Sequence, residues 1–209
     1  MSKRISTGIY RYDKHFCNNK VKKKLFGLMT DHERVGELIR DGSRILDFGC
    51  GDCSFFDSLK NRRLDLVGYD LDERYTEIGK KKGYKIFNSL NEVTGEFDYV
   101  VANQVVEHMD LDLLNEFFQK GFDLLKKDGI LIISTLNARE LYVVRDIWDD
   151  PTHVRPYSSR ALERAGKEFN FSLVKVMKHH MRMNPLKLFL NVVFGFSIYS
   201  GITLVFKKT

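Results

Sequence analysis

The sequence is poor in cysteine and proline, with three of each in 209 residues. Cys17, Cys50 and Cys53 are too few, and odd in number, for a disulfide framework, so we expect a reducing, cytoplasmic environment. So few prolines, and no low-complexity tract or internal repeat, argue against long disordered segments. Segment 1–16 is charged and lacks the apolar stretch of a secretory signal. These absences exclude a disulfide-stapled secreted domain.

The chain is 43% hydrophobic and 30% charged, which is enough for one domain with a sizeable core. Its formal net charge is +6, and lysines gather at 20–24 and 80–82. We interpret these lysine runs as solvated helix faces. The positive charge mildly favours anionic partners such as nucleic acid, phosphorylated substrates or acidic lipid.

Apolar runs alternate with amphipathic segments along most of the chain. A capping box formed by Thr30 and Glu33 opens the first expected helix. Lys126 and Lys127 are expected at the end of the last helix of this series, where they complement its dipole. Strands are expected at 43–49, 64–72, 84–87, 97–104 and 128–137, and helices at 30–40, 54–61, 72–83 and 110–127. This alternation predicts an α/β fold with a parallel sheet, covered on both faces, that binds ligands at the carboxyl ends of its strands.

The stretch "ILDFGCGDCS" (45–54) reads as a strand, a glycine turn and a helix. Gly49 and Gly51 permit a tight turn and the close approach of a ligand. Asp70 follows about 20 residues later, at the end of the next strand, where a carboxylate can accept hydrogen bonds from a ribose diol. Position 54 is serine, unlike the third glycine of the dinucleotide fingerprint. Asp47 suits a positively charged cofactor, and S-adenosylmethionine carries both a sulfonium and an ammonium group.

Four stretches in register, "ILDFGCGDCS", "LVGYDLD", "FDYVVANQVVEHM" and "LLKKDGILIISTLN", resemble the successive motifs of class I S-adenosylmethionine-dependent methyltransferases. The match spans about residues 30–137, and the chain is most similar to the small-molecule and glycan branches of that family. The resemblance implies a Rossmann-like, open, seven-stranded and mostly parallel sheet with helices on both faces and an antiparallel last strand.

The resemblance also assigns cofactor contacts. Asp47 and the backbone from Gly49 through Cys50 to Gly51 would face the amino-acid portion, and Asp70 would hold the ribose hydroxyls. The other residues implied are Leu71 against the adenine, Asn88 or Ser89 near the adenine amine, and Gln104 after the fourth strand. Cys53 stands where the family usually has a third glycine. Cys50 and Cys53 form a single C-x-x-C, to which we assign neither a redox nor a zinc role, because nucleotide binding already explains this loop.

Three residues are candidates for the chemistry. In "DDPTHVRPYS" (149–158), His153 is the best general base, because histidine titrates near neutral pH; the alternative is a structural role in the loop. Arg155 would clamp a phosphate or carboxylate, or else pair with one of the neighbouring aspartates. His108, with Glu107 before it, either caps the next helix, supports the cofactor loop, or binds metal.

The metal alternative comes from resemblance to ubiquinone-pathway O-methyltransferases and small-RNA 2′-O-methyltransferases, which have a Glu-x-x-Glu-His motif. Here Gln104 replaces the first glutamate, while Glu107 and His108 are kept and His153 is available. Because a neutral amide is a poor ligand for a hard divalent cation, we predict no metal.

We predict one domain over 1–209, with a helical cap (1–40), a cofactor-binding core (41–137) and a substrate-facing part (138–209). Ser158 is expected to cap the helix that follows it. No charged residue lies between Leu188 and Phe206. We interpret this run as a helix at 185–194 and the last strand of a hairpin, with contact of 185–199 to a membrane surface as the alternative.

The sequence therefore predicts methyl transfer from S-adenosylmethionine to a hydroxyl of a small molecule or glycan. The first alternative is an RNA 2′-O-methyltransferase, which the positive charge favours. The second is a non-catalytic, cofactor-binding partner subunit. The sequence does not indicate the methyl acceptor, because substrate specificity in this fold lies in variable loops. It does not indicate the oligomeric state either.

Overall fold

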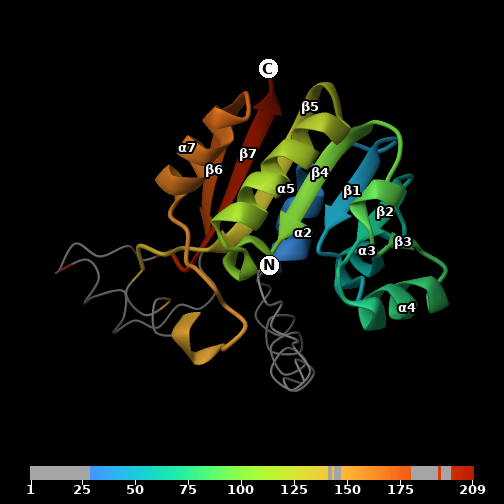
Figure 1. Cartoon of the computed structure of the whole chain (residues 1–209), viewed down its shortest axis with the longest axis horizontal. Coiled ribbons are helices and arrows are strands. Elements are labelled where there is room, and N and C mark those ends of the chain that lie inside the picture. The colour runs from blue at the N-terminus through green and yellow to red at the C-terminus, as the bar shows by residue number, and fades with distance from the viewer. Residues whose placement is uncertain (1–28, 141–142, 144–146, 180–192, 194–198) are drawn as a thin grey trace.

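A computed structural model of the chain describes residues 29–140, 143, 147–179, 193 and 199–209. Its described strands form one seven-stranded sheet in the order β3-β2-β1-β4-β5-β7-β6 (Figure 1). The strands are β1 (Arg44–Phe48), β2 (Asp65–Tyr69), β3 (Lys85–Phe87), β4 (Phe97–Asn103), β5 (Leu125–Leu136), β6 (Phe171–His179) and β7 (Gly201–Lys208). Neighbours among β1 to β5 pair in parallel, whereas β7 is antiparallel to both β5 and β6. The predicted fold class is confirmed.

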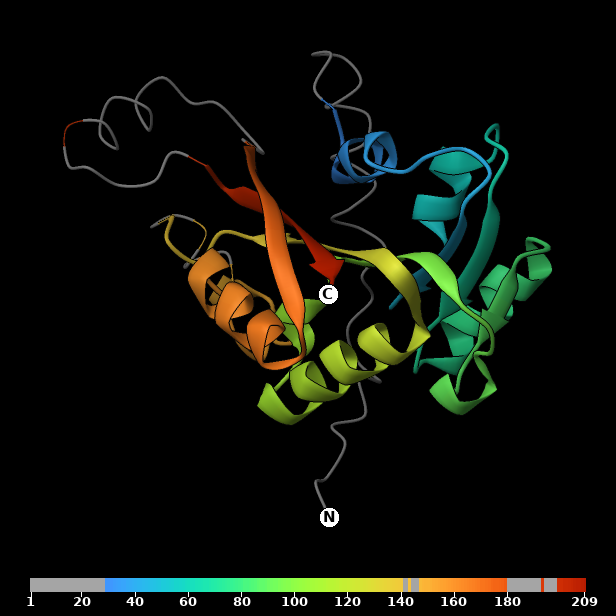
Figure 2. The ribbon, with the colours of Figure 1, turned by 90° about the horizontal axis from the view of Figure 1, so that it is seen from above.

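Helices cover both faces of the sheet (Figure 2). The helical elements are α2 (Asp31–Glu37), α3 (Ser54–Leu59), α4 (Glu73–Lys81), α5 (Leu111–Leu124), α7 (Ser159–Glu168) and the short 3₁₀ turns η1 (Leu90–Glu92) and η2 (Val106–His108). Thr30 and Glu33 form the predicted capping box of α2, and Ser158 accepts a hydrogen bond from the amide of Ala161 at the start of α7. These helix starts were correctly predicted because capping is a local interaction.

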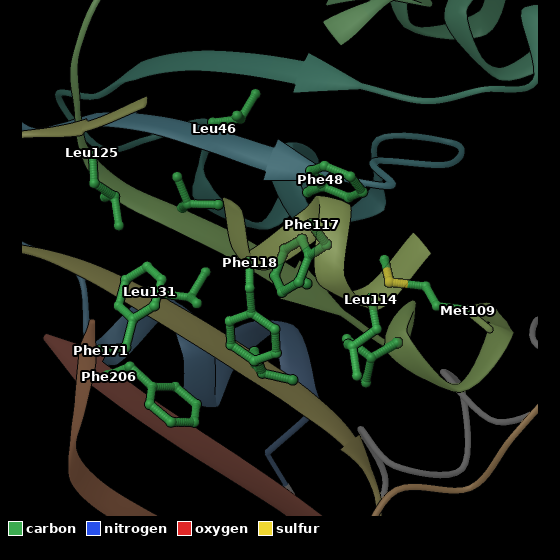
Figure 3. Packing of buried hydrophobic residues seen from close by; sticks show 14 of the residues in the cluster. Leu46, Phe48, Met109, Leu114, Phe117, Phe118, Leu125, Leu131, Phe171 and Phe206 are labelled. Carbon is green, nitrogen blue, oxygen red and sulfur yellow. The ribbon is translucent and has the colours of Figure 1, made fainter. Parts of the chain in front are cut away.

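Consecutive residues of the central strands face opposite sides, as the two-residue period of a strand requires. On one side, Leu46, Val100 and Leu131 pack with Phe117 and Phe118 of α5 (Figure 3). On the other side, the sequence neighbours of these three strand residues pack against α2 and α3. These neighbours are Ile45, Val101 and Ile132. The central strands of the sheet are therefore buried on both faces.

The structure contradicts one prediction about the end of α5. Lys126 and Lys127 do not complete the helix, because α5 ends at Leu124 and β5 begins at the next residue. Leu125 is fully buried and pairs with Phe97 of β4. Lys126 instead donates to the Asp98 carboxylate over 2.7 Å. Burial of Leu125 in the sheet therefore outweighs the small gain from placing two cations at a helix end.

The predicted C-terminal hairpin is present: β6 and β7 pair from Phe171 and Lys208 to His179 and Gly201, with a shift of register between Leu173 and Lys175. Three predicted segments lie wholly or mostly outside the described residues. They are the helix expected at 185–194, the segment 185–199 and the first part of the N-terminal cap. Among the residues that the structure describes, no helix has both the length and the apolar character needed to span a membrane.

Candidate functional site

The loop after β1 lies at the carboxyl ends of β1, β2 and β4. Gly49 and Gly51 have φ values of 79° and 49°, in the left-handed region that glycine adopts without strain. The amides of Gly49 and Cys50 both donate to the carbonyl of Tyr69, at the end of β2. A Cβ on Gly49 would lie 2.7 Å from the γ carbons of Val105. Only glycine therefore fits between β2 and the segment after β4.

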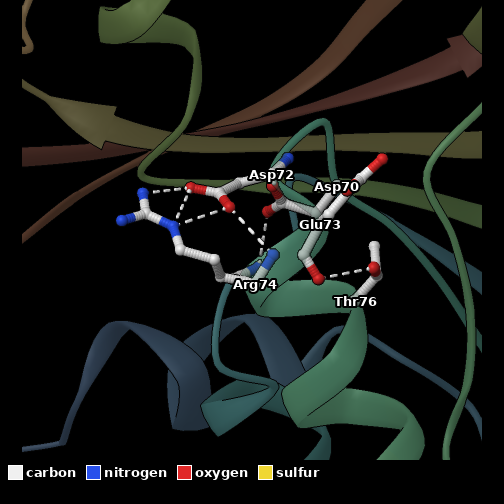
Figure 4. A network of polar contacts seen from close by, with 6 residues as sticks. Asp70, Asp72, Glu73, Arg74 and Thr76 are labelled. Atoms are coloured by element: carbon white, nitrogen blue, oxygen red, sulfur yellow. Dashed lines mark hydrogen bonds and ion pairs between the residues drawn. The ribbon is translucent and has the colours of Figure 1, made fainter. Parts of the chain in front are cut away.

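Asp70, directly after β2, connects this strand to the glycine loop. Figure 4 shows Asp70 beside Asp72 at the start of α4. One oxygen of its carboxylate accepts the amide of Gly51 at 2.8 Å, and the other accepts the amide of Asp72 at 2.9 Å. Burial raises the pKa of Asp70, and these two hydrogen bonds oppose that rise. Because each carboxylate oxygen has two lone pairs, one position on each remains for a ribose hydroxyl.

Asp47 is only 2% exposed, on β1 before the glycine loop. Burial, and secondarily the negative charge of Asp70, raise the pKa of Asp47 to about 8. A carboxyl group in such surroundings is poised for a cation, because an adjacent positive charge would favour its ionised form.

Two further polar side chains lie at the end of β4. Both amide atoms of Asn103, and the Nε2 of Gln104, are buried and have no hydrogen-bond partner among the described residues. Gln104 has a φ of 58°, and its backbone amide donates to the carbonyl of Ser134 on β5. Buried polar atoms without partners are rare, and a bound ligand, an ion or water can supply the missing hydrogen bonds. Gln104 was predicted; Asn103 was missed, although its place at the end of a strand is the same signal.

We expect the affinity for S-adenosylmethionine to depend on the ionisation of Asp47. Below about pH 8 the free chain carries this carboxyl in its protonated form, whereas the cofactor's positive charge favours the carboxylate. Binding then releases a proton, so the affinity rises with pH by up to about tenfold per unit and levels off above pH 8.

Calorimetry at several pH values, on the wild type and on Asp47→Asn, measures this pH dependence of the affinity for S-adenosylmethionine. The difference between the two proteins cancels the titration of the cofactor itself. A difference that stays constant from about pH 6 to pH 8 would contradict the assignment of Asp47.

The remaining predicted cofactor residues lie on the loops after β2 and β3. Leu71 is 55% exposed, which leaves an apolar surface free beside Asp70. Asn88 is exposed, and the Ser89 hydroxyl accepts the amide of Asn91 at the start of η1. The roles of these three residues stay predictions.

The stretch 149–158 is fixed to η2 by its backbone. The amides of Val154 and Arg155 both donate to the carbonyl of Glu107. Nδ1 of His108 lies 3.0 Å from the carbonyl of Thr152, and the Asp150 carboxylate accepts the amide and hydroxyl of that threonine. The loop's stiffness therefore comes from these hydrogen bonds as well as from its prolines.

His108 and His153 face each other, with ring centroids 4.8 Å apart. Nδ1 of His153 lies 2.9 Å from the carbonyl of Ile147. Nδ1 of His108 likewise contacts a carbonyl, that of Thr152, at 3.0 Å. Because a carbonyl only accepts, both Nδ1 atoms carry the proton, and each Nε2 has a free lone pair in the neutral ring.

Glu107 completes this group. Its buried carboxyl accepts a hydrogen bond from the Thr135 hydroxyl, and burial raises its pKa to about 7. One ligand atom from each of Glu107, His108 and His153 lies within 4.8 Å of the other two, so these residues could hold a metal ion. The prediction of no metal is therefore still untested.

Two expected pairings in this region are wrong. Asp110, and not Glu107 or His108, caps α5, by accepting the amide of Leu113. Among the described residues Arg155 makes no ion pair with an aspartate; its guanidinium lies over the ring of Tyr157, 5.7 Å from the centroid. An open pocket of about 490 Å³ beside it is lined by Asp110, Leu111, Asp112, Val154 and Arg155.

Comparison with known proteins identifies the family of the chain. A family model described as a methyltransferase domain matches residues 21–176. The chain belongs to this family. The S-adenosylmethionine-dependent methyltransferase predicted from the sequence is thus confirmed at the level of family and fold, and the glycine loop, the two aspartates and the unpaired amides of β4 fit that cofactor.

Curated relatives include the mitochondrial ubiquinone biosynthesis O-methyltransferase of Rattus norvegicus, 30% identical over 141 residues, or 61% of this chain and 40% of the relative. The ubiquinone biosynthesis O-methyltransferase of Azorhizobium caulinodans is 33% identical over 107 residues, or 46% of this chain and 41% of the relative. The methyltransferase chain thus spans about two fifths of the length of these relatives.

Solved structures show the same fold. A SAM-dependent methyltransferase from Archaeoglobus fulgidus superposes with a TM-score of 0.69 at 20% identity, covering 90% of this chain and 99% of the other. A mycolic acid cyclopropane synthase, complexed with SAH and CTAB, gives a TM-score of 0.61 at 13% identity, covering 81% and 79%. At these identities the likeness concerns the fold alone.

Proposed function

We propose that the chain methylates a hydroxyl oxygen of a small molecule or glycan, with S-adenosylmethionine as donor. The observation that carries the proposal is the His153 ring, whose Nδ1 is held by the Ile147 carbonyl and whose Nε2 is free to accept a proton. A hydroxyl must lose its proton during transfer, and a positioned histidine is the most common group for that task.

The cofactor supplies an electrophilic methyl group on a positively charged sulfur. Asp70 would accept hydrogen bonds from the ribose hydroxyls, and Asp47 would face the cationic end. His153 would take the proton from the acceptor hydroxyl at Nε2. The curated relatives support this reading because their names describe O-methylation in ubiquinone biosynthesis.

A second candidate function is metal-assisted methylation of an RNA 2′-hydroxyl. An RNA acceptor is favoured by the net charge of +6. The metal requirement of this function is favoured by the convergence of Glu107, His108 and His153, since two histidines and a carboxylate form a common site for divalent transition metals. An ion held there would lower the pKa of a bound hydroxyl and orient it. His153 would then be a ligand and not a base.

One assay separates the two functions. Methyl transfer from labelled S-adenosylmethionine is measured on hydroxylated aromatic precursors of quinones, on saccharides and on short RNAs, before and after treatment with EDTA. We expect label on oxygen of a small acceptor and an unchanged rate after EDTA. Loss of activity that Mn²⁺ or Mg²⁺ restores, with RNA as acceptor, would favour the second function. Label found only on nitrogen would contradict both.

A further inference from the structure

Cys50 and Cys53 enclose the middle of the glycine loop and lie at opposite ends of one tight turn. The amide of Cys53 donates to the carbonyl of Cys50 over 2.9 Å. A hydrogen-bonded turn of four residues brings its end Cα atoms within about 7 Å, close to the range of about 4.4–6.8 Å that a disulfide spans. The spacing of this C-x-x-C indicates no role by itself, but the folded chain brings the two residues together.

The two sulfur atoms share one buried space beneath the loop. A Cβ on Gly68 of β2 would lie 2.8 Å from Sγ of Cys50 and 2.5 Å from Cδ1 of Ile86. A Cβ on Gly79 of α4 would lie 2.8 Å from Sγ of Cys53 and 2.6 Å from Cγ1 of the same isoleucine. The absence of side chains at these two glycines makes room for both thiols against Ile86.

The surroundings shift the pKa values of the two buried thiols in opposite directions. A hydrogen bond from Cys50 lowers the pKa of Cys53, and the nearby Lys82 ammonium acts in the same direction. The same hydrogen bond and burial raise the pKa of Cys50. Because the thiolate is the nucleophile, Cys53 is the thiol that attacks an oxidant first, and the neighbouring Cys50 can then attack the oxidised sulfur.

We propose that Cys50 and Cys53 form a reversible disulfide in the presence of a hydroperoxide, and that this disulfide weakens cofactor binding. The Cys53 thiolate attacks the peroxide; the O–O bond breaks, water or an alcohol leaves, and a sulfenic acid forms on Cys53. The Cys50 thiol then attacks that sulfur, the S–O bond breaks and a second water leaves. The two cysteines lose two electrons, which reduce the hydroperoxide. Transient disulfides of this kind are typical of redox-sensing proteins in reducing compartments.

The effect on binding follows from the position of Cys50 between the two glycines. Its amide and that of Gly49 are held by Tyr69, and the amide of Gly51 is held by Asp70. Joining the sulfurs at about 2.05 Å, with a dihedral angle of about 85–100°, restricts the conformation of this turn and thereby the positions of these amides. By reciprocity, a bound cofactor must disfavour the disulfide at equilibrium by the same factor by which the disulfide weakens cofactor binding. This part of the inference rests on the proposed function, because it takes the loop as the cofactor site.

The test uses the full chain with Cys17→Ser, so that only the two loop cysteines remain. The reduced protein is treated with hydrogen peroxide, and its intact mass and its affinity for S-adenosylhomocysteine are measured before treatment, after treatment and after dithiothreitol. We expect the loss of two hydrogen atoms and an affinity at least tenfold weaker, both restored by the reductant. Cys53→Gly in the same background is the control: glycine suits the φ of 63° at that position, and peroxide should not change its affinity.

Two results would overturn the proposal: a native, peroxide-treated protein that retains both thiols, or a disulfide that leaves the affinity unchanged. Failure of the reduced protein to bind S-adenosylhomocysteine would instead overturn the proposed function and the binding half of this inference. Formation of the disulfide would still be decided by the mass measurement.

Discussion

Replacing His153 with alanine is expected to lower turnover on a hydroxyl acceptor by roughly 10²- to 10⁴-fold, the usual contribution of a positioned general base. The dissociation constant for S-adenosylhomocysteine should stay the same, because His153 lies on the segment after β5 and not on the loops after β1 and β2. Single-turnover kinetics and calorimetry measure the two quantities separately.

A second substitution distinguishes catalysis from support of the loop. Asparagine at position 153 keeps an N–H group that can donate to the Ile147 carbonyl, as Nδ1 of the histidine does, but it has no basic nitrogen. If His153 only fixes the loop, His153→Asn should recover the activity that His153→Ala loses. If His153 is the base, both variants should be equally slow.

The second large effect is expected at Asp70. In Asp70→Asn, the side-chain nitrogen would face either the amide of Gly51 or that of Asp72, both of which are donors. It would also fail to accept from one ribose hydroxyl. Hydrogen bonds to charged groups contribute about 1.5–3 kcal/mol each. We therefore expect S-adenosylhomocysteine to bind at least roughly 100-fold more weakly, as measured by calorimetry.

Asp72→Asn is the matched control for that experiment. It makes the same chemical change two residues away, at the start of α4, where the carboxylate accepts the amide of Arg74. Because asparagine caps helices as well as aspartate does, the fold should be kept. An equal loss of affinity in both variants would mean that the charge of this segment matters and not the hydrogen bonds of Asp70.

Much of the fold was predictable because its signals are local. The strand–glycine–helix pattern around Gly49 and Gly51 depends on backbone conformations that few other residues adopt, and the structure has both at positive φ. The capping box at Thr30 and the cap at Ser158 likewise involve residues within one turn. Asp70 was placed beside the glycine loop because parallel neighbouring strands end at the same edge of a sheet.

Other features could not be read from the sequence because they depend on partners far along the chain. The start of β5 at Leu125 is decided by Phe97 across the sheet, so Lys126 and Lys127 were misplaced. The hydrogen bond from Thr135 to Glu107 joins residues on two separate elements. The shared space of Cys50 and Cys53 requires Ile86 and two glycines from β2 and α4. Spacing within one motif carries no information about such contacts.

The carbonyl of Glu107 accepts hydrogen bonds from the amides of both Val154 and Arg155, and this affects any attempt to change the methyl acceptor of the enzyme. This carbonyl joins the segment after β4 to the segment after β5, so the two segments move as one unit. An insertion or deletion in either segment would change the position of the other. Transplanting specificity from another enzyme of this fold would therefore require both segments to be exchanged together, with their common hydrogen-bond acceptor kept.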